Sequence, residues 1–220
     1  CKDLTKCQAI VRNQYFKPLS NKTVYQPCEA PIVNLEGLWC KNRWRKPTVE
    51  PDSSVDPYPF FRHLLDVLKD YEKVNYLIDM LSFRYQNRSH KKPHVAFYFY
   101  GKQGGAGKST FADTLVKVFG ESAIRITNTV DALKGKGAVD LWTSTFLIVE
   151  EAQVSKGTQL YDIIKSYTGD DYVHTDRKFE AVTKQHIPAQ LIMLSNRPPM
   201  FIENLSLIHI SEPTRRRGTS

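Results

Sequence analysis

The sequence GKQGGAGKST, residues 101–110, constrains the fold of this chain more than any other stretch. It follows an apolar run, residues 95–100, that is typical of a buried strand. It precedes a helical pattern whose apolar face ends before Gly120. A strand, a glycine-rich loop and a helix N-terminus together bind phosphate, because converging backbone N–H groups and the helix dipole favour an anion. The stretch therefore predicts a nucleoside triphosphate site.

Within this stretch the Lys108 ammonium would reach the β- and γ-phosphates, and the Ser109 hydroxyl would bind Mg²⁺. The strict pattern G-x-x-x-x-G-K-[ST] places glycine at position 102, whereas this chain has Lys102 there and Gly101 one position earlier. A chance cluster of glycine and lysine in a loop is the alternative, and the flanking strand and helix argue against it. The predicted nucleotide-binding residues are Gly104, Gly105, Ala106, Gly107, Lys108, Ser109 and Thr110.

Two adjacent carboxylates follow a second apolar run. Residues 146–149 are typical of a buried parallel strand, and Glu150 and Glu151 come directly after it. Beside a phosphate-binding loop, Glu150 would hold Mg²⁺ through water, and Glu151 would orient and polarise the attacking water. The alternative is a strand that simply ends in two exposed acids.

A third apolar run, residues 190–195, is followed by Asn196. Its amide would hydrogen-bond to the γ-phosphate or to the attacking water. An ordinary turn asparagine before two prolines would look the same, so this residue taken alone leaves both alternatives open. Together with Lys108 and Glu151, Asn196 completes the candidate catalytic set.

The segment before this third run predicts a helix and then a β-hairpin. Residues 160–167 have a helical apolar pattern, and residues 172–176 and 179–187 alternate as strands do. Arg177 and Lys178 lie between the two alternating segments, at the tip of the predicted hairpin. A cationic tip is suited to the phosphate backbone of a nucleic acid.

The composition restricts the class of protein. The chain has 220 residues, 41% hydrophobic and 25% charged, as in ordinary globular proteins. No apolar run approaches the ~20 residues that cross a bilayer, so no membrane partner is expected. The formal charge of +8 suits a polyanionic partner. Cys1, Cys7, Cys28 and Cys40 form no C-x-x-C pair, which favours free thiols in a reducing cytoplasm (that of the host cell if the chain is viral) over a zinc site.

Four segments are expected along the chain. In order, they are the end of an upstream region with a linker (1–57), a helical hairpin (58–90), the nucleotide-binding core (91–204) and a foreign tail (205–220). The tail resembles a translated sequencing adapter and is excluded from the fold prediction. Removing its one acidic residue and three arginines lowers the net charge from +8 to +6.

In the first segment, Leu38, Trp39 and Trp44 are the expected packing anchors. Since the chain begins with Cys1, a longer parent sequence is also expected.

The motifs between residues 101 and 196 resemble those of superfamily 3 helicases, and within them the primase-helicases of phages, plasmids and poxviruses. The resemblance covers about residues 60–204. The matching residues are Lys108 and Ser109 in the first motif, Glu150 and Glu151 in the second, Lys165, Gly169, Asp170 and Lys178 in the family-specific segment, and Asn196 in the third.

This resemblance implies an α/β fold with an AAA+-like P-loop NTPase core, in which a parallel sheet carries an inserted β-hairpin and follows a small helical segment. It implies an ATPase and DNA helicase that uses ATP and Mg²⁺ and translocates on single-stranded DNA. It also implies a hexameric ring with ATP hydrolysed at subunit interfaces, and an upstream primase domain. Arg177 and Lys178 would then contact the DNA inside the ring.

Three departures from the family pattern are expected to matter. The family has an arginine finger after the third motif, worth about 10³–10⁵ in hydrolysis rate, and no arginine follows Arg197 before residue 205. The chain as printed is therefore expected to hydrolyse ATP poorly. The last core strand, which would flank the phosphate-loop strand, is also expected to be missing, leaving an unpaired hydrophobic edge. Finally, Phe179 replaces a glycine that often follows the tip lysine, and its ring would be able to stack on a base.

Two other classes of function are open from the sequence. One is an AAA+-like switch that binds a nucleotide and regulates a partner without unwinding DNA. The other is a P-loop kinase, which requires an acceptor pocket and usually an arginine-rich lid where this chain has a basic hairpin. Stimulation of ATP hydrolysis by single-stranded DNA would distinguish the helicase from both.

Overall fold

The computed structural model describes residues 19–27, 29–35, 37–87, 92–101, 107–133, 141–152, 159–175, 183–197 and 207–211. The chain divides into two compact units, Cys1–Arg45 and Lys46–Ser220. Each unit is described by itself. No helix in the described part of the chain is long and apolar enough to span a membrane.

The first unit contains a three-stranded sheet in the order β1-β3-β2. Its strands are β1 (Leu19–Val24), β2 (Ile32–Leu35) and β3 (Leu38–Asn42). Strand β3 pairs parallel to β1 and antiparallel to β2. The sheet lies within residues 1–57, where the sequence predicts the end of an upstream region and a linker, and that division stays a prediction.

The small core of this unit is built from Val24, Val33 and Cys40. Asn42 is fully buried, and its side chain accepts from the N–H of Gln26 at 3.0 Å and donates to the carbonyl of the same residue at 2.8 Å. The expectation that Leu38 packs inside is wrong, because it lies at the end of the β2–β3 hairpin and is 56% exposed.

Trp39 and Trp44, the other expected anchors, are half-buried.

The second unit begins with the two helices expected from the sequence, α2 (Tyr58–Leu68) and α3 (Tyr71–Gln86). Proline stands in the first turn of α2, where its missing N–H is not needed. Lys69 ends α2 in the left-handed conformation, and the Asp70 carboxylate then caps α3 by accepting from the N–H of Lys73 at 3.1 Å.

A five-stranded sheet in the order β10-β4-β9-β6-β5 forms the centre of this unit, and every pairing in it is parallel. Its strands are β4 (Ala96–Tyr100), β5 (Ile124–Thr127), β6 (Phe146–Val149), β9 (Gln190–Ser195) and β10 (Leu207–Ser211). The helical elements between them are α4 (Lys108–Phe119), η1 (Glu121–Ala123), η2 (Val130–Leu133) and α6 (Gln159–Gly169).

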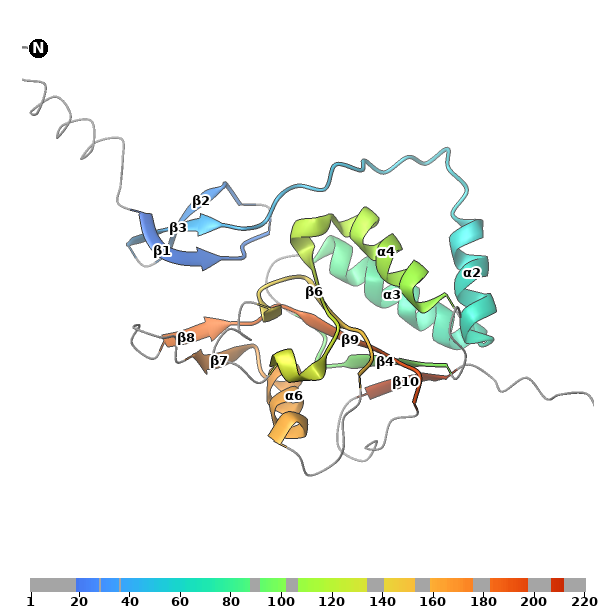
Figure 1. Cartoon of the computed structure of the whole chain (residues 1–220). Helices are drawn as coiled ribbons and strands as arrows, with labels where there is room; N and C mark the ends of the chain where they lie inside the picture. Colours follow the sequence, from blue (N-terminus) through green and yellow to red (C-terminus); the bar gives the residue numbers. More distant parts are fainter. Residues whose placement is uncertain are drawn as a thin grey trace, which may run out of the picture. The chain divides into compact units, whose positions relative to one another are not determined.

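Helices cover both faces of the sheet, with α3 and α4 on one side and α6 on the other (Figure 1). On the first face, the Phe99 ring lies 4.9 Å from that of Phe111 in α4, and Phe146 lies 4.8 Å from Phe119. On the second face, Tyr98 belongs to the apolar cluster that includes α6. Burial on both faces explains why the strands read as continuous apolar runs in the sequence.

The expectation that no strand flanks the phosphate-loop strand is wrong. Strand β10 pairs parallel to β4, with Leu207 opposite Ala96 and Ser211 opposite Tyr100. The segment LIHIS is rich in residues that favour strands, and pairing satisfies the backbone groups that β4 would otherwise expose. The foreign origin of residues 205–220 stays a prediction, since strand pairing does not test it.

Strands β7 (Tyr172–Thr175) and β8 (Thr183–His186) form the antiparallel hairpin expected between α6 and β9. Its tip, with Arg177 and Lys178, lies outside the described residues.

We predict that Ile148→Ala lowers the free energy of unfolding by about 2–5 kcal/mol, because Ile148 is fully buried and its truncation leaves a cavity. Ile126→Ala is the matched control, since Ile126 lies opposite Ile148 on β5 but is 42% exposed. Its cost should not exceed about 1 kcal/mol. Chemical denaturation measures both, and equal losses would contradict the burial assigned to this face of the sheet.

Candidate functional site

The parallel sheet brings the carboxyl ends of four strands to one edge. In the pairing, Tyr100 lies opposite Ser195, Met193 opposite Val149, and Val149 opposite Thr127. The residues singled out from the sequence follow these strand ends directly: the loop to Lys108 follows β4, the two glutamates follow β6, and Asn196 follows β9. The crevice outside the carboxyl ends of an open parallel sheet is where such folds bind ligands.

The N-terminus of α4 is the first part of this site. Gly107 precedes the helix with φ +83°, a left-handed conformation that favours glycine, and Lys108 begins it. The Lys108 Nζ donates to the carbonyl of Gly101 at 3.2 Å, so this side chain spans the two ends of the glycine-rich loop. Ser109 and Thr110 are exposed on the first turn.

Residues 102–106 lie outside the described residues, so the placement of Gly104, Gly105 and Ala106 stays a prediction.

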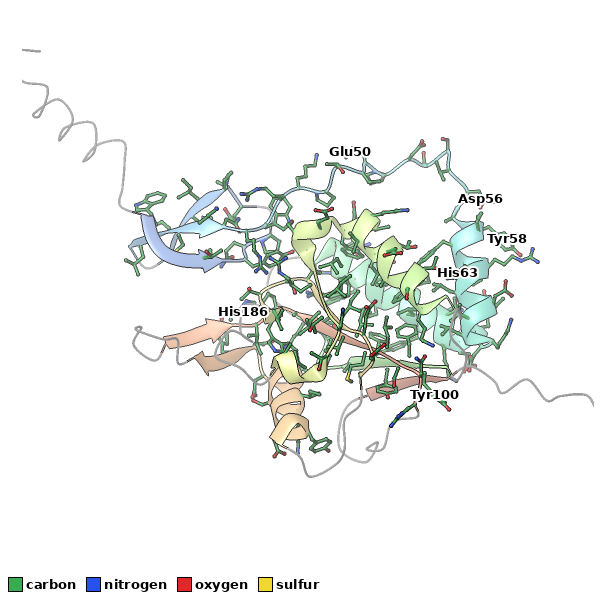
Figure 2. The ribbon with its side chains drawn as sticks, viewed as in Figure 1. Glu50, Asp56, Tyr58, His63, Tyr100 and His186 are labelled. Atoms are coloured by element: carbon green, nitrogen blue, oxygen red, sulfur yellow. The ribbon has the colours of Figure 1, made fainter. Side chains whose placement is uncertain are left out.

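His63 on α2 contacts this helix N-terminus, which the sequence analysis did not anticipate. A Cβ atom on Gly107 would lie 2.7 Å from His63 Cε1 and 3.0 Å from Val67 Cγ2. Figure 2 shows His63 pointing from α2 toward α4. The contact joins the helical hairpin to the nucleotide loop, and only the tertiary packing reveals it, because α2 is distant from the loop in sequence.

The two glutamates form a strained turn at the end of β6. The Glu150 N–H donates to the carbonyl of Thr127 at 2.8 Å, and the Ala152 N–H donates to that of Leu194 at 2.9 Å. Glu151 lies between these two anchors, is exposed, and has φ +54°. A left-handed conformation at a residue other than glycine costs about 1–3 kcal/mol and persists where the surroundings enforce it, as at functional sites.

Asn196 is exposed at the end of β9, directly after the buried Ser195. The Ser195 hydroxyl accepts from the N–H of Arg197 at 3.1 Å, and the Ser195 carbonyl accepts from the N–H of Gly101 at 3.2 Å. These bonds attach the backbone around Asn196 to the start of the nucleotide loop.

Tyr98, on β4, was not identified from the sequence as a site residue. It is 1% exposed, and its hydroxyl lies 2.9 Å from the Arg197 carbonyl and 3.3 Å from the Ala152 carbonyl. Burial raises the pKa of Tyr98, and a hydrogen bond with the Ser195 side chain acts in the opposite direction. A tyrosine inside an apolar strand offers no sequence signal for this role, because the same pattern fits a packing residue.

The donors at this edge fit Mg²⁺ chemically. The Ser109 hydroxyl and the Glu150 carboxylate are the oxygen ligands that this hard cation prefers, and Mg²⁺ usually keeps several waters alongside one or two carboxylates. Among the described residues, no group of three or more His, Cys, Asp or Glu side chains could hold a metal ion by itself. The fit is therefore to a cation shared with a bound phosphate.

The base of the β7–β8 hairpin lies near the amino ends of the sheet strands, opposite the edge formed by their carboxyl ends. Figure 2 shows His186 of β8 and Tyr100 of β4 on opposite sides of the unit. The Tyr172 ring, 51% exposed, lies 5.1 Å from the His186 ring. His94 Nε2 lies 3.3 Å from the Asp171 carboxylate, which connects the start of β4 to the base of the hairpin.

Two buried cations support this edge. The fully buried Arg84 donates through Nη2 to the carbonyls of Thr145 at 3.1 Å and Pro188 at 2.8 Å, just before β6 and β9. Burial lowers the pKa of Lys92 to about 8, opposed by the nearby Asp171.

Of the family-specific segment, Lys165, Gly169 and Asp170 are exposed at and just after the end of α6.

The site combines a strand, a glycine loop with a lysine at the following helix N-terminus, and acidic and amide side chains at the ends of neighbouring strands. This combination defines an α/β domain of the P-loop class. The profile of a protein family described as "Family of unknown function (DUF5906)" matches residues 99–216, which is 118 of the 220 residues. The chain belongs to this family. The match extends into residues 205–216, part of the segment set aside above as foreign. No curated protein sequence matches the chain significantly.

Solved structures of the NrS-1 C-terminal region share this fold. One apo structure has a TM-score of 0.68 at 23% identity and covers 94% of this chain and 52% of that chain. Another, of residues 305–718, has a TM-score of 0.69 at 21% identity and covers 98% and 55%. The chain thus spans about half the length of the structures it matches.

We predict that Gly107→Ala destabilises the fold through both backbone strain and collision with His63. The left-handed conformation costs about 1–2 kcal/mol for a residue with a Cβ, and the collision adds about 1–3 kcal/mol. Denaturation of Gly107→Ala, His63→Ala and the double variant separates the two costs. Because His63→Ala removes the colliding atoms, the double variant should be more stable than the sum of the single effects, whereas strict additivity would contradict the contact.

Proposed function

We propose that this chain contains the ATPase core of a single-stranded DNA translocase or helicase that works as a ring. The observation that carries the proposal is the convergence of Lys108, the Glu150–Glu151 turn and Asn196 at the carboxyl edge of one parallel sheet. Each came from a separate motif. The parallel sheet explains why the three strand ends meet at one edge, and a shared nucleotide site explains why a lysine, two carboxylates and an amide follow them there.

In this proposal ATP binds with its phosphates at the N-terminus of α4. The loop N–H groups and Lys108 hold the β- and γ-phosphates, and Mg²⁺ is shared between the phosphates, the Ser109 hydroxyl and Glu150. Glu151 accepts the proton of the attacking water, and Asn196 orients that water or the γ-phosphate. The exposed side chains of Glu151 and Asn196, on a buried and hydrogen-bonded backbone, are suited to this division of roles.

The nucleic-acid part of the proposal rests on the basic hairpin. The β7–β8 hairpin leads directly into β9, which ends at Ser195 just before Asn196, so one strand joins the hairpin base to the edge where the nucleotide is proposed to bind. The formal charge of +8, or +6 without residues 205–220, agrees with a polyanionic partner. The hexameric ring, hydrolysis at subunit interfaces and an upstream primase domain are further parts of this proposal.

We expect Lys108→Ala to abolish ATP binding and Glu151→Gln to retain binding while single-turnover hydrolysis falls at least 100-fold. The first change removes the cation that pairs with the phosphates, and the second removes the base but keeps the shape of the side chain. Titration with a fluorescent ATP analogue measures binding. Single-turnover assays resolve the slow rate expected of the chain as printed.

Lys117→Ala and Glu121→Gln are the matched controls, since Lys117 is exposed in the last turn of α4 and Glu121 is exposed in η1, just after that helix. Both variants should behave as the parent chain. Normal hydrolysis by Glu151→Gln would exclude Glu151 as the base, and normal binding by Lys108→Ala would exclude the nucleotide site.

We expect Lys178→Ala to remove the stimulation of ATP hydrolysis by single-stranded DNA and to leave ATP affinity unchanged. The hairpin tip contacts the DNA backbone in this proposal, and such contacts weaken steeply with salt. The assay compares hydrolysis with and without an oligonucleotide at two salt concentrations, with Lys117→Ala as the charge-matched control. DNA stimulation absent from the parent chain itself would favour the nucleotide switch or the kinase.

A further inference from the structure

Two backbone carbonyls converge on one buried hydroxyl behind the candidate site. The Tyr98 hydroxyl lies 2.9 Å from the carbonyl of Arg197 and 3.3 Å from that of Ala152. A phenol has one proton to donate, so the nearer Arg197 carbonyl receives most of this bond. These partners come from two different strand ends, β6 and β9.

The sheet register explains how one side chain reaches both ends. Tyr98 lies opposite Met193, and Met193 lies opposite Val149, so the three residues form a row across the sheet and point to the same face. Side chains in strands lean along the strand direction. The tyrosine ring therefore extends from this row to the backbone that follows it on β9, the neighbouring strand, and on β6, the next strand beyond β9.

The surroundings of Tyr98 do not require a hydroxyl for packing. Its neighbours in the core cluster include Ala96, Leu147, Val149 and Met193, all of which a phenylalanine ring would contact equally well. A buried hydroxyl is retained where it has partners, and here both carbonyl partners belong to the segments that follow predicted site residues.

The two bonded residues bracket those site residues closely. Ala152 follows Glu151, and its own N–H is held by the Leu194 carbonyl at 2.9 Å. Arg197 follows Asn196, and its N–H is held by the Ser195 hydroxyl at 3.1 Å. The Tyr98 hydroxyl thus donates chiefly to the Arg197 carbonyl and shares its proton with the more distant Ala152 carbonyl, so one side chain links the backbone after Glu151 with the backbone after Asn196.

We propose that Tyr98 is a positioning residue, whose hydroxyl sets the separation of Glu151 and Asn196 by tying the Ala152 and Arg197 carbonyls to the strand that leads into the nucleotide loop. This inference rests on the proposed function for its effect on hydrolysis, and on the described contacts alone for its effect on the backbone. It concerns turnover more than affinity, because both carbonyl partners follow Glu151 and Asn196, whereas Lys108 and Ser109 lie on α4.

Tyr98→Phe tests the proposal, with Tyr76→Phe as the matched control because Tyr76 is 44% exposed on α3. Single-turnover hydrolysis of Mg²⁺-ATP should fall about 10-fold to 100-fold in Tyr98→Phe, since small displacements of catalytic groups cost that much, while ATP affinity stays within about twofold of the parent. Hydrogen exchange should accelerate at the amides of Ala152 and Arg197. Tyr76→Phe should change none of these quantities.

Ser195→Ala provides a second variant, which removes the hydroxyl that accepts from the Arg197 N–H. The same selective loss of turnover is expected, and it tests the positioning of this segment if Tyr98→Phe fails to fold. Parent-like hydrolysis and exchange in Tyr98→Phe would overturn the proposal, as would equal losses of affinity and turnover. If the parent chain shows no hydrolysis, the proposed function fails, whereas the exchange comparison still supports or overturns the tie between the two segments.

Discussion

The parallel register of β4, β9 and β6 is the constraint on which the candidate site depends. Tyr100 opposite Ser195 and Met193 opposite Val149 bring three strand ends to one edge, so the residues that follow them converge. A shift of one residue would exchange the two faces of a strand. Aromatic contacts with α4 on one face and the α6 cluster on the other make such a shift costly, so the core that stabilises the fold also fixes the site.

Rigidity at this edge comes from backbone hydrogen bonds, and the chemistry comes from exposed side chains. Val149 and Ser195 are buried, whereas Glu151 and Asn196, one or two positions later, are exposed. The left-handed conformation of Glu151 is enforced by bonds to β5 and β9 on either side of it. Gly107 plays the equivalent part at α4, where its positive φ and the contact with His63 leave no room for a Cβ. Strain and close packing therefore occur where the predicted ligand would lie.

The opposite edge of the sheet carries a different set of interactions. Arg84 on α3 donates hydrogen bonds to backbone carbonyls just before β6 and β9. The contact between His94 and Asp171 joins the start of β4 to the hairpin base. The strands that end at the nucleotide edge therefore begin beside the hairpin. A domain with this connectivity places the proposed nucleotide site and the hairpin at the two ends of the same strands.

The sequence by itself determined the strands, the helices and most of the candidate site. Apolar runs that end in Glu150 or Asn196, and a glycine loop that ends in Lys108, are local signals, and a parallel sheet gathers strand ends at one edge whatever the loops do. Local signals could not reveal β10, because that segment was judged foreign, or the exposure of Leu38, which depends on where a hairpin ends. Only the tertiary structure decided the roles of His63 and Tyr98. Each acts through residues distant in sequence, and burial and hydrogen-bond partners of that kind exist only after the chain has packed.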